Sequence, residues 1–387
     1  MITTINNKHN KLNVPNLRFP EFQGEWEKMR LDAFTERVMR KNKSNQSRLP
    51  LTISAQYGLV DQITFFNKVV ASTDLSNYYL LKKGEFAYNK SYSSDYPWGA
   101  IKRLDNYDQG ALSSLYICFA PQDNVVSDFI LQYFESPKWH KGISEIAVEG
   151  ARNHGLLNVA VQDFFHTYHY VSKDKKEQIK ISKLLMLLDE RISTQNKIID
   201  KLQSLIKGIR NDVYGKLRKS VGFNAMISDV LSYEQPQPYI VENTEYTAEG
   251  IPVLTANKAF VLGYTSETDG IYDKGDCIIF DDFTLDCKYV DFPFKVKSSA
   301  IKILTAKDKE LLRYTFEFMK YLDLSTDEHK RHYIAETQNQ ELFLPTAQVV
   351  RTIAHAFSAL SSRMKTVTKQ RDLFELQKQY LLRQMFI

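Results

Sequence analysis

The chain has 387 residues, of which 43% are hydrophobic and 25% are charged. These values are ordinary for a globular protein and exclude a disordered chain. No apolar run approaches the ~20 residues that a membrane-spanning helix requires, and the polar N-terminus does not resemble a secretory signal. Three cysteines without a Cys-x-x-Cys pair argue against a disulfide framework and a thiolate zinc site. We therefore expect a cytoplasmic protein of two or three domains.

The first 172 residues are expected to form a mixed α/β globule. Apolar, β-rich runs at 86–88 and 114–119 predict strands, and residues 127–134 predict a helix. This segment carries a net charge of only +2.

Residues 173–219 follow as a basic segment, with 13 basic and 6 acidic side chains. Residues 177–214 contain no proline, and apolar residues recur in alternating steps of four and three, which is typical of a coiled-coil seam. A helix of ~38 residues would be ~57 Å long. The predicted seam consists of Ile181, Leu185, Leu188, Ile192, Ile199, Leu202 and Ile206.

Residues 220–345 repeat the landmarks of the first globule in the same order. Residues 52–57 resemble 253–258, residues 81–86 resemble 272–277, and residues 151–154 correspond to 330–333. Strands are expected at 277–280 and 300–304, and a helix at 309–321. The segment carries 12 basic and 21 acidic side chains, and this balance counts against simple electrostatic binding of DNA.

The last segment, residues 346–387, is basic again, with 7 basic and 2 acidic side chains. Shifting the same four-three pattern by 172 places it on ten positions from 353 to 385, of which eight are apolar and two, Arg371 and Lys378, are polar. The predicted second seam consists of Ile353, Phe357, Leu360, Met364, Phe374 and Leu381. Two similar helices, each following a globule, can pack antiparallel within one chain. The resulting pseudo-two-fold symmetry suits a split DNA site, because the strands of duplex DNA are themselves related by two-fold axes.

The sequence lacks the motifs of several enzyme classes. It has no two adjacent prolines, and therefore no Asn-Pro-Pro-Tyr-type methylation motif. It also has no Gly-x-Gly-x-x-Gly and no phosphate-binding loop. The pairs His166/His169 and His329/His332 lack a nearby third ligand, and Asp281 and Asp282 read as a polar turn. We predict no catalytic residue and no metal site.

Residues that can contact DNA occur at matched positions of the two halves. Amide and guanidinium groups can read base edges, whereas lysines and hydroxyl groups can meet the phosphates. The candidates are Gln56, Tyr57, Lys90, Ser91, Tyr92, Arg152, Asn153 and His154 in the first half, and Asn257, Lys258, Phe283, Thr284, Arg331, His332 and Tyr333 in the second.

The sequence resembles the specificity subunits of type I restriction-modification systems. The opening Leu-Arg-Phe-Pro-Glu-Phe at 17–22 with Trp26 looks like the N-terminus of that family. Residues 86–92 and 330–334 are similar to parts of its target-recognition domains, and residues 178–192 to its central helix. The second helix departs from the pattern, because Leu-Ser-Ser-Arg at 360–363 replaces the Leu-Asp-Glu-Arg found at 188–191.

The resemblance implies an α+β fold with an internal duplication. Two mixed α/β target-recognition domains, at 1–172 and 220–345, would be joined by two long antiparallel coiled-coil helices, at 173–219 and 346–387. Each domain would read one half of a bipartite site in double-stranded DNA, and the helices would set the spacer between the halves.

The resemblance also implies the partners of the chain. Two methyltransferase subunits would dock on it, and two motor-nuclease subunits would join for restriction. S-adenosylmethionine, ATP and magnesium would be bound by these partners and not by this chain, which would be non-catalytic within a type I deoxyribonuclease and adenine-N6 methyltransferase.

Two other functions remain as alternatives. One is a self-contained DNA-modifying enzyme, which would need a cofactor motif. The other is a coiled-coil scaffold, which would have little use for two diverged copies of a globular domain.

Overall fold

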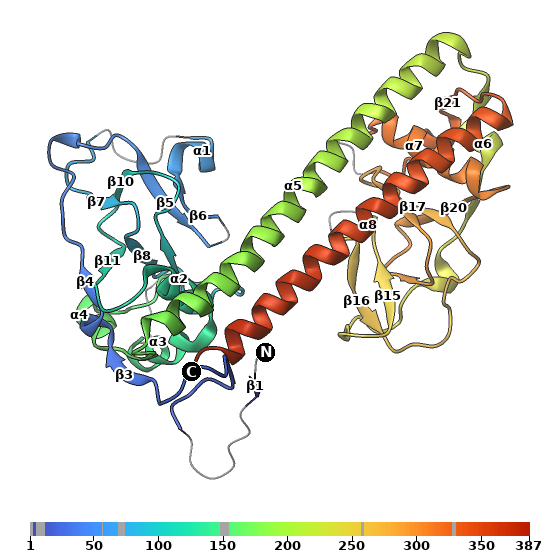
Figure 1. Ribbon diagram of the computed structural model, residues 1–387. Helices are drawn as coiled ribbons and strands as arrows, with labels where there is room; N and C mark the ends of the chain where they lie inside the picture. The colour runs from blue at the N-terminus through green and yellow to red at the C-terminus, as the bar shows by residue number, and fades with distance from the viewer. Residues whose placement is uncertain are drawn as a thin grey trace. The chain divides into compact units, whose positions relative to one another are not determined.

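The computed structural model describes residues 3–4, 12–55, 57–68, 74–147, 155–256, 259–326 and 330–387 (Figure 1). The chain divides into two compact units, one formed by Met1–Thr194 with Arg371–Ile387 and the other by Gln195–Gln370. The boundary falls inside both long helices, α5 (Lys175–Ser220) and α8 (Ala347–Gln384). Each unit therefore combines a globular head with parts of both helices. We call residues 12–174 the first head and residues 221–346 the second head.

The first head is built on two four-stranded sheets. One sheet has the strand order β4-β11-β8-β9, and the other has the order β6-β5-β10-β7, in which β5 and β10 are parallel. The helix α2 (Ser127–Glu135) and the strand pair β3–β12 complete the core. The strands are β3 (Glu27–Arg30), β4 (Thr35–Arg37), β5 (Pro50–Ser54), β6 (Gly58–Asp61), β7 (Tyr79–Lys82), β8 (Phe86–Asn89), β9 (Ala100–Arg103), β10 (Gln109–Leu112), β11 (Ile117–Pro121) and β12 (Tyr168–Val171).

The second head repeats this arrangement. Its four-stranded sheet has the order β14-β20-β17-β18, and its smaller sheet has the order β16-β15-β19, with β15 and β19 parallel. The helix α7 (Lys309–Leu322) packs against the larger sheet, and β13 pairs with β21. The strands are β13 (Ala225–Met226), β14 (Leu231–Glu234), β15 (Ile251–Leu254), β16 (Val261–Thr265), β17 (Cys277–Asp281), β18 (Cys287–Val290), β19 (Lys295–Val296), β20 (Ile301–Ala306) and β21 (Glu341–Leu342).

The two heads share one topology, which confirms the internal duplication expected from the sequence. Strands β4, β11, β8 and β9 correspond in order to β14, β20, β17 and β18. The helix that follows the last of these strands along the chain, β11 or β20, is α2 in the first head and α7 in the second. Gly84 and Gly275, which precede β8 and β17, both have positive φ angles, of 87° and 103°. A side chain at either position would be strained, so both copies keep glycine at the same turn.

Both predicted long helices are present, with 46 residues in α5 and 38 residues in α8. They run side by side within each unit (Figure 1). In the first unit Asp189 pairs with Lys378, and the Arg191 guanidinium lies 5.5 Å from the Phe374 ring centroid. Going forward along α5 from Asp189 to Arg191, the contacted residue on α8 moves backward from Lys378 to Phe374. The two helices are therefore antiparallel there.

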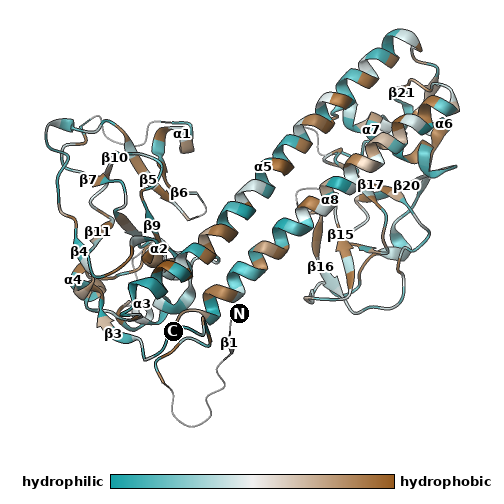
Figure 2. Cartoon of the chain, in the orientation of Figure 1, coloured by the Kyte–Doolittle hydropathy of each residue, from teal (hydrophilic) through white to brown (hydrophobic). Residues whose placement is uncertain are grey.

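The predicted seam positions of both helices are all buried or half-buried, whereas exposed polar residues alternate with them along the helices (Figure 2). The division of the chain at 172, 219 and 345 stays a prediction, because each compact unit combines a head with helical segments.

The N-terminal motif has a structural role at the start of α5. The buried carboxylate of Glu177 accepts hydrogen bonds from Arg18 Nε (2.7 Å), Arg18 Nη2 (3.0 Å), Trp26 Nε1 (3.1 Å) and Ser172 Oγ (2.5 Å). Arg18 also donates to the carbonyl groups of Gly24 and Gln23. The first head is thereby fixed to the first turn of α5.

A buried histidine completes the core of the first unit. His169 bonds through Nδ1 to the Tyr133 hydroxyl and through Nε2 to the Thr167 hydroxyl, both at 2.8 Å. Burial lowers the pKa of His169 to about 3, because the charged form would lose its hydration. The ring is therefore neutral in the folded protein at neutral pH.

Candidate nucleic-acid interface

In the second head, the turn after β17 brings two of the predicted residues to the surface. Asp281 Oδ1 accepts the backbone N–H groups of Phe283 (2.9 Å) and Thr284 (3.0 Å). Leu285 then adopts a φ of 60°, which closes the turn before β18. The side chains of Phe283 and Thr284 are exposed as a result.

A second aspartate ties this turn to the loop that follows α7. Asp282 Oδ1 accepts the backbone N–H groups of His332 (3.0 Å) and Tyr333 (2.8 Å). Its other carboxylate oxygen lies 3.2 Å from Lys302 Nζ, and both side chains are buried. A buried carboxylate needs such donors, since leaving it unpaired would be costly. The turn and the loop are therefore held together at one end of the sheet.

Arg331 is exposed on that loop and lies next to the turn. Its guanidinium carbon is 6.0 Å from the Phe283 ring centroid, and Nη2 is 3.4 Å from Ser299 Oγ. Glu336 bonds to Lys330 Nζ (2.9 Å) and to His332 Nδ1 (2.8 Å), and these bonds lower the pKa of Glu336. The structure thus brings Phe283, Thr284 and Arg331 into one exposed surface, which we call the second reading surface.

Two further residues predicted to contact DNA are buried, which corrects that expectation. His332 is 2% exposed and Tyr333 is 1% exposed. The Tyr333 ring packs against Phe280 at 5.5 Å and against Tyr233 at 5.7 Å, and burial raises its pKa to about 12. Both side chains support the loop from beneath, because the backbone bonds to Asp282 turn them toward the core.

The first head presents its candidates at the equivalent place, after β8. Lys90 O accepts the N–H of Leu157 (2.9 Å), and Gly155 O accepts the N–H of Tyr92 (3.0 Å). Ser91 and Tyr92 are exposed, and Lys90 is half-buried. We call these three residues the first reading surface. The predicted residues Arg152, Asn153 and His154 lie outside the described residues, as do Gln56, Asn257, Lys258 and His329.

Tyr57 belongs to an exposed aromatic patch that sequence reasoning missed. Its side chain is 62% exposed at the turn between β5 and β6, and its ring lies 6.4 Å from that of Phe65. Phe65 and Phe66 are also exposed, on the short helix α1 (Gln62–Phe66), which Asp61 caps. A helix of five residues is too short to show a periodicity, so the only sequence signal was the pair of adjacent phenylalanines.

These surfaces offer donors and aromatic faces, which suit binding. Arginine donors pair with guanine or phosphate, and aromatic rings can stack on bases. In the described part of the chain, no group of three or more His, Cys, Asp or Glu residues is arranged to hold a metal ion. Cys118, Cys277 and Cys287 are all buried, and burial raises the pKa of each thiol. Among the described residues, no helix is long and apolar enough to cross a membrane.

Known proteins support the resemblance in both sequence and fold. No family model matches the sequence. Over 126 residues the chain is 44% identical to the specificity subunit of the type I restriction enzymes EcoR124I/EcoR124II from Escherichia coli. That stretch covers 31% of this chain and 31% of the relative.

The crystal structure of a type I restriction-modification S subunit from M. genitalium aligns over 97% of this chain and 99% of its own, with a TM-score of 0.64 and 14% identity. At that identity the structural match shows the fold alone. The chain thus has the fold of a type I specificity subunit and, over about a third of its length, a closely related sequence. The resemblance expected from the motifs is confirmed.

Proposed function

We propose that the chain is the DNA-specificity subunit of a type I restriction-modification complex. The observation that carries this proposal is the identity of 44% to a specificity subunit, in a chain whose two heads repeat one topology. Each head would read one half of a bipartite site in double-stranded DNA, and the antiparallel helices would set the spacer. The chain itself would catalyse nothing.

The reading surfaces support this role chemically. Arg331 can donate two hydrogen bonds to guanine or to a phosphate, with Phe283 and Thr284 beside it. Lys90, Ser91 and Tyr92 offer the corresponding donors in the first head. A self-contained DNA-modifying enzyme is not favoured, because the protein whose sequence matches this chain and the structure whose fold matches it are both specificity subunits.

The end of α8 offers a surface for a partner. Leu373, Leu376 and Tyr380 are 54%, 67% and 58% exposed, and they follow one another at spacings of three and four. They therefore form one apolar stripe on the helix, away from the seam residues Phe374 and Leu381. Exposed apolar patches of this kind mark sites of protein association.

We expect two methyltransferase subunits to dock on the helices, and two motor-nuclease subunits to join them for restriction. S-adenosylmethionine, ATP and magnesium would be bound by those partners. The cytoplasm is the expected compartment, on the grounds of the three unpaired cysteines.

Binding of randomised duplexes tests the proposal. The chain would be purified together with its methyltransferase partner, and the bound duplexes would be sequenced. We expect two short specified segments separated by an unspecified spacer of one length. S-adenosylmethionine binding by the chain alone, or the absence of any sequence preference in the assembled complex, would contradict the proposal.

A further inference from the structure

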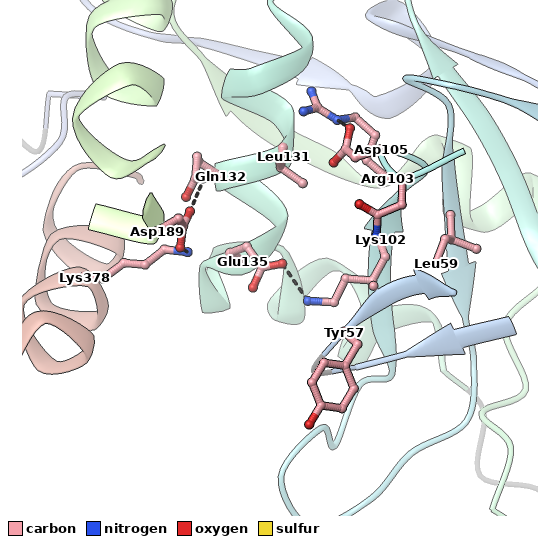
Figure 3. Close-up of a pocket in the computed structure, with 12 residues that line it drawn as sticks. Tyr57, Leu59, Lys102, Arg103, Asp105, Leu131, Gln132, Glu135, Asp189 and Lys378 are labelled. Atoms are coloured by element: carbon pink, nitrogen blue, oxygen red, sulfur yellow. Dashed lines mark hydrogen bonds and ion pairs between the residues drawn. The ribbon is translucent and has the colours of Figure 1, made fainter. Parts of the chain in front are cut away.

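A polar contact joins three helices in the first unit. Gln132 of α2 is 1% exposed, and its Nε2 donates to Asp189 Oδ2 of α5 at 2.9 Å. The other carboxylate oxygen of Asp189 accepts from Lys378 Nζ of α8 at 2.5 Å. Figure 3 shows these side chains beside a pocket of about 370 Å³, which Lys102 and Glu135 also line. We call Gln132, Asp189 and Lys378 the first junction.

The second unit has a corresponding contact with different chemistry. Glu317 of α7 is 1% exposed and accepts from Arg210 of α5 at 2.7 and 2.9 Å, and from Arg313 Nη2 at 2.7 Å. Arg313 also donates to Phe357 O at 3.2 Å and to Ser361 Oγ, both on α8. We call Arg210, Arg313 and Glu317 the second junction. Each junction therefore links the helix of one head to both long helices.

The departure from the family pattern in the second helix has a physical reason here. Ser361 stands at the position that Asp189 occupies in the first helix, 172 residues earlier. Asp189 faces a neutral glutamine from the head, whereas Ser361 faces an arginine that already has a carboxylate partner in Glu317. An aspartate at 361 would add a second carboxylate to Arg313. In each unit, the residue of the long helix therefore suits the residue that it meets from the head: Asp189 suits Gln132, and Ser361 suits Arg313.

Stability alone does not account for these junctions. In the second junction Arg313 and Glu317 are 8% and 1% exposed, and replacing such a buried ion pair by apolar residues is often neutral or stabilising. In the first junction Asp189 is 42% exposed, and a partly exposed ion pair contributes little to stability. Each junction also leaves one buried polar atom without a hydrogen-bond partner among the described residues, Gln132 Oε1 in the first and Arg313 Nε in the second. Such an atom lowers stability further. Directional polar contacts do, however, select one register between packed elements, as a single polar residue does in a coiled-coil seam.

We infer that the two junctions are positioning residues that fix how each head is seated on its helices, and that they thereby determine the spacer length accepted between the two half-sites. This inference rests on the proposed function. Lys378 supports it, because it is one of the few polar residues at a seam position and it pairs with Asp189.

The test measures spacer choice in the assembled methyltransferase. The methylated motif of the unmodified chain is first determined by sequencing the methylated DNA of cells. Methylation is then compared at sites whose spacer is one base pair shorter or longer, with the half-sites unchanged. Glu317→Gln weakens the second junction. The triple variant Arg210→Met, Arg313→Met and Glu317→Leu replaces it with apolar side chains of similar length. The triple variant Gln132→Leu, Asp189→Leu and Lys378→Met does the same for the first junction and leaves no buried amide unpaired there.

We expect each variant to lower discrimination against the wrong spacer by about 10-fold, as a coupling of about 1.4 kcal/mol would. The bases recognised in each half-site should not change. Lys216→Met is the control, because it breaks the exposed Lys216–Asp212 pair on the same helix, and its spacer preference should match that of the unmodified chain.

If the Glu317→Gln protein does not fold, the apolar variants still test the inference, because they are expected to fold with unchanged or raised thermal stability. Folded apolar variants that keep the full spacer discrimination would overturn the inference and leave the proposed function intact. An unmodified chain without a bipartite motif would overturn the proposed function itself.

Discussion

Three of the acidic residues that make the second head negative are buried and bound to donors inside it. Asp281 and Asp282 hold backbone amides, and Glu317 binds two arginines, so these three acids face inward. The net charge of this head therefore overstates the negative potential at its reading surface. Arg331, by contrast, is exposed next to Phe283 and is supported by the buried Asp282 through the loop backbone.

Replacing Arg331 by alanine tests that surface. The change should weaken DNA binding by the assembled methyltransferase by ~1–3 kcal/mol and relax one position of one half-site if Arg331 pairs with guanine. Contact with a phosphate should instead lower affinity across all sequences and reduce the salt slope by about one unit. Affinities measured at several salt concentrations, on matched and mismatched duplexes, distinguish the two results.

Lys307→Ala is the matched control for Arg331. Lys307 is exposed just beyond the opposite end of β20, away from the turn and the loop. It should leave affinity, salt slope and sequence preference unchanged. An Arg331→Ala protein that behaves like this control would remove Arg331 from the interface.

His169 predicts a dependence of stability on acid pH. Its pKa is about 3 in the folded protein and ~6.5 when unfolded. Between these values the unfolded chain binds a proton that the folded chain does not. The free energy of unfolding should therefore fall as the pH drops below 6.5, by up to about 1.4 kcal/mol per pH unit from this group.

Thermal unfolding between pH 7 and pH 5 measures this effect. His169→Gln should show a smaller loss of stability over that range than the unmodified chain, and substitution of the exposed His166 by glutamine should leave the loss as it is. An equal loss in the His169→Gln protein would show that another group is responsible.

At the scale of elements, the sequence was most informative where a periodic pattern ran long. The four-three spacing predicted both long helices, and the repeated landmarks predicted matching strands, because such patterns reflect the burial of one face. The sequence was least informative in loops. The sequence predicted His332 and Tyr333 as contact residues because polar and aromatic residues in a loop are usually exposed. Their backbone bonds to Asp282, together with the packing of the Tyr333 ring, turn both side chains inward.

The internal repeat also allowed part of the candidate surfaces to be predicted. Phe283 and Thr284 follow a strand at the place equivalent to Lys90–Tyr92, which the repeat indicates. The patch of Tyr57 and Phe65, like the two junctions, depends on contacts between residues far apart in the chain or within a single short turn. Neither produces a periodic signal.

The packing of the helices can be tested at neighbouring positions of α5. Leu188 is buried in the seam, whereas Leu187 is largely exposed. Leu188→Asp would place an unpaired charge among apolar side chains and should lower stability by roughly 3–5 kcal/mol. Leu187→Asp should have little effect on thermal unfolding. Equal melting temperatures for the two variants would show that the seam is wrongly placed at Leu188.

At the scale of the whole molecule, one structural plan occurs twice with different surface chemistry. The two heads share strand order, the glycine turn before the central strand and the attachment of their helix to α5 and α8. They differ in their reading surfaces and in the residues of their junctions. A shared fold with different exposed side chains is what the proposed reading of two different half-sites requires. The proposal therefore predicts that the two heads are separable in function.

Exchange of one head therefore tests the central claim most directly. Residues 1–172 would be replaced by the same segment of a relative, and the methylated DNA of cells carrying the hybrid and its methyltransferase would be sequenced. The account predicts a bipartite motif in which one half changes while the other half stays the same. A hybrid that folds and assembles but changes both halves, or neither, would contradict it.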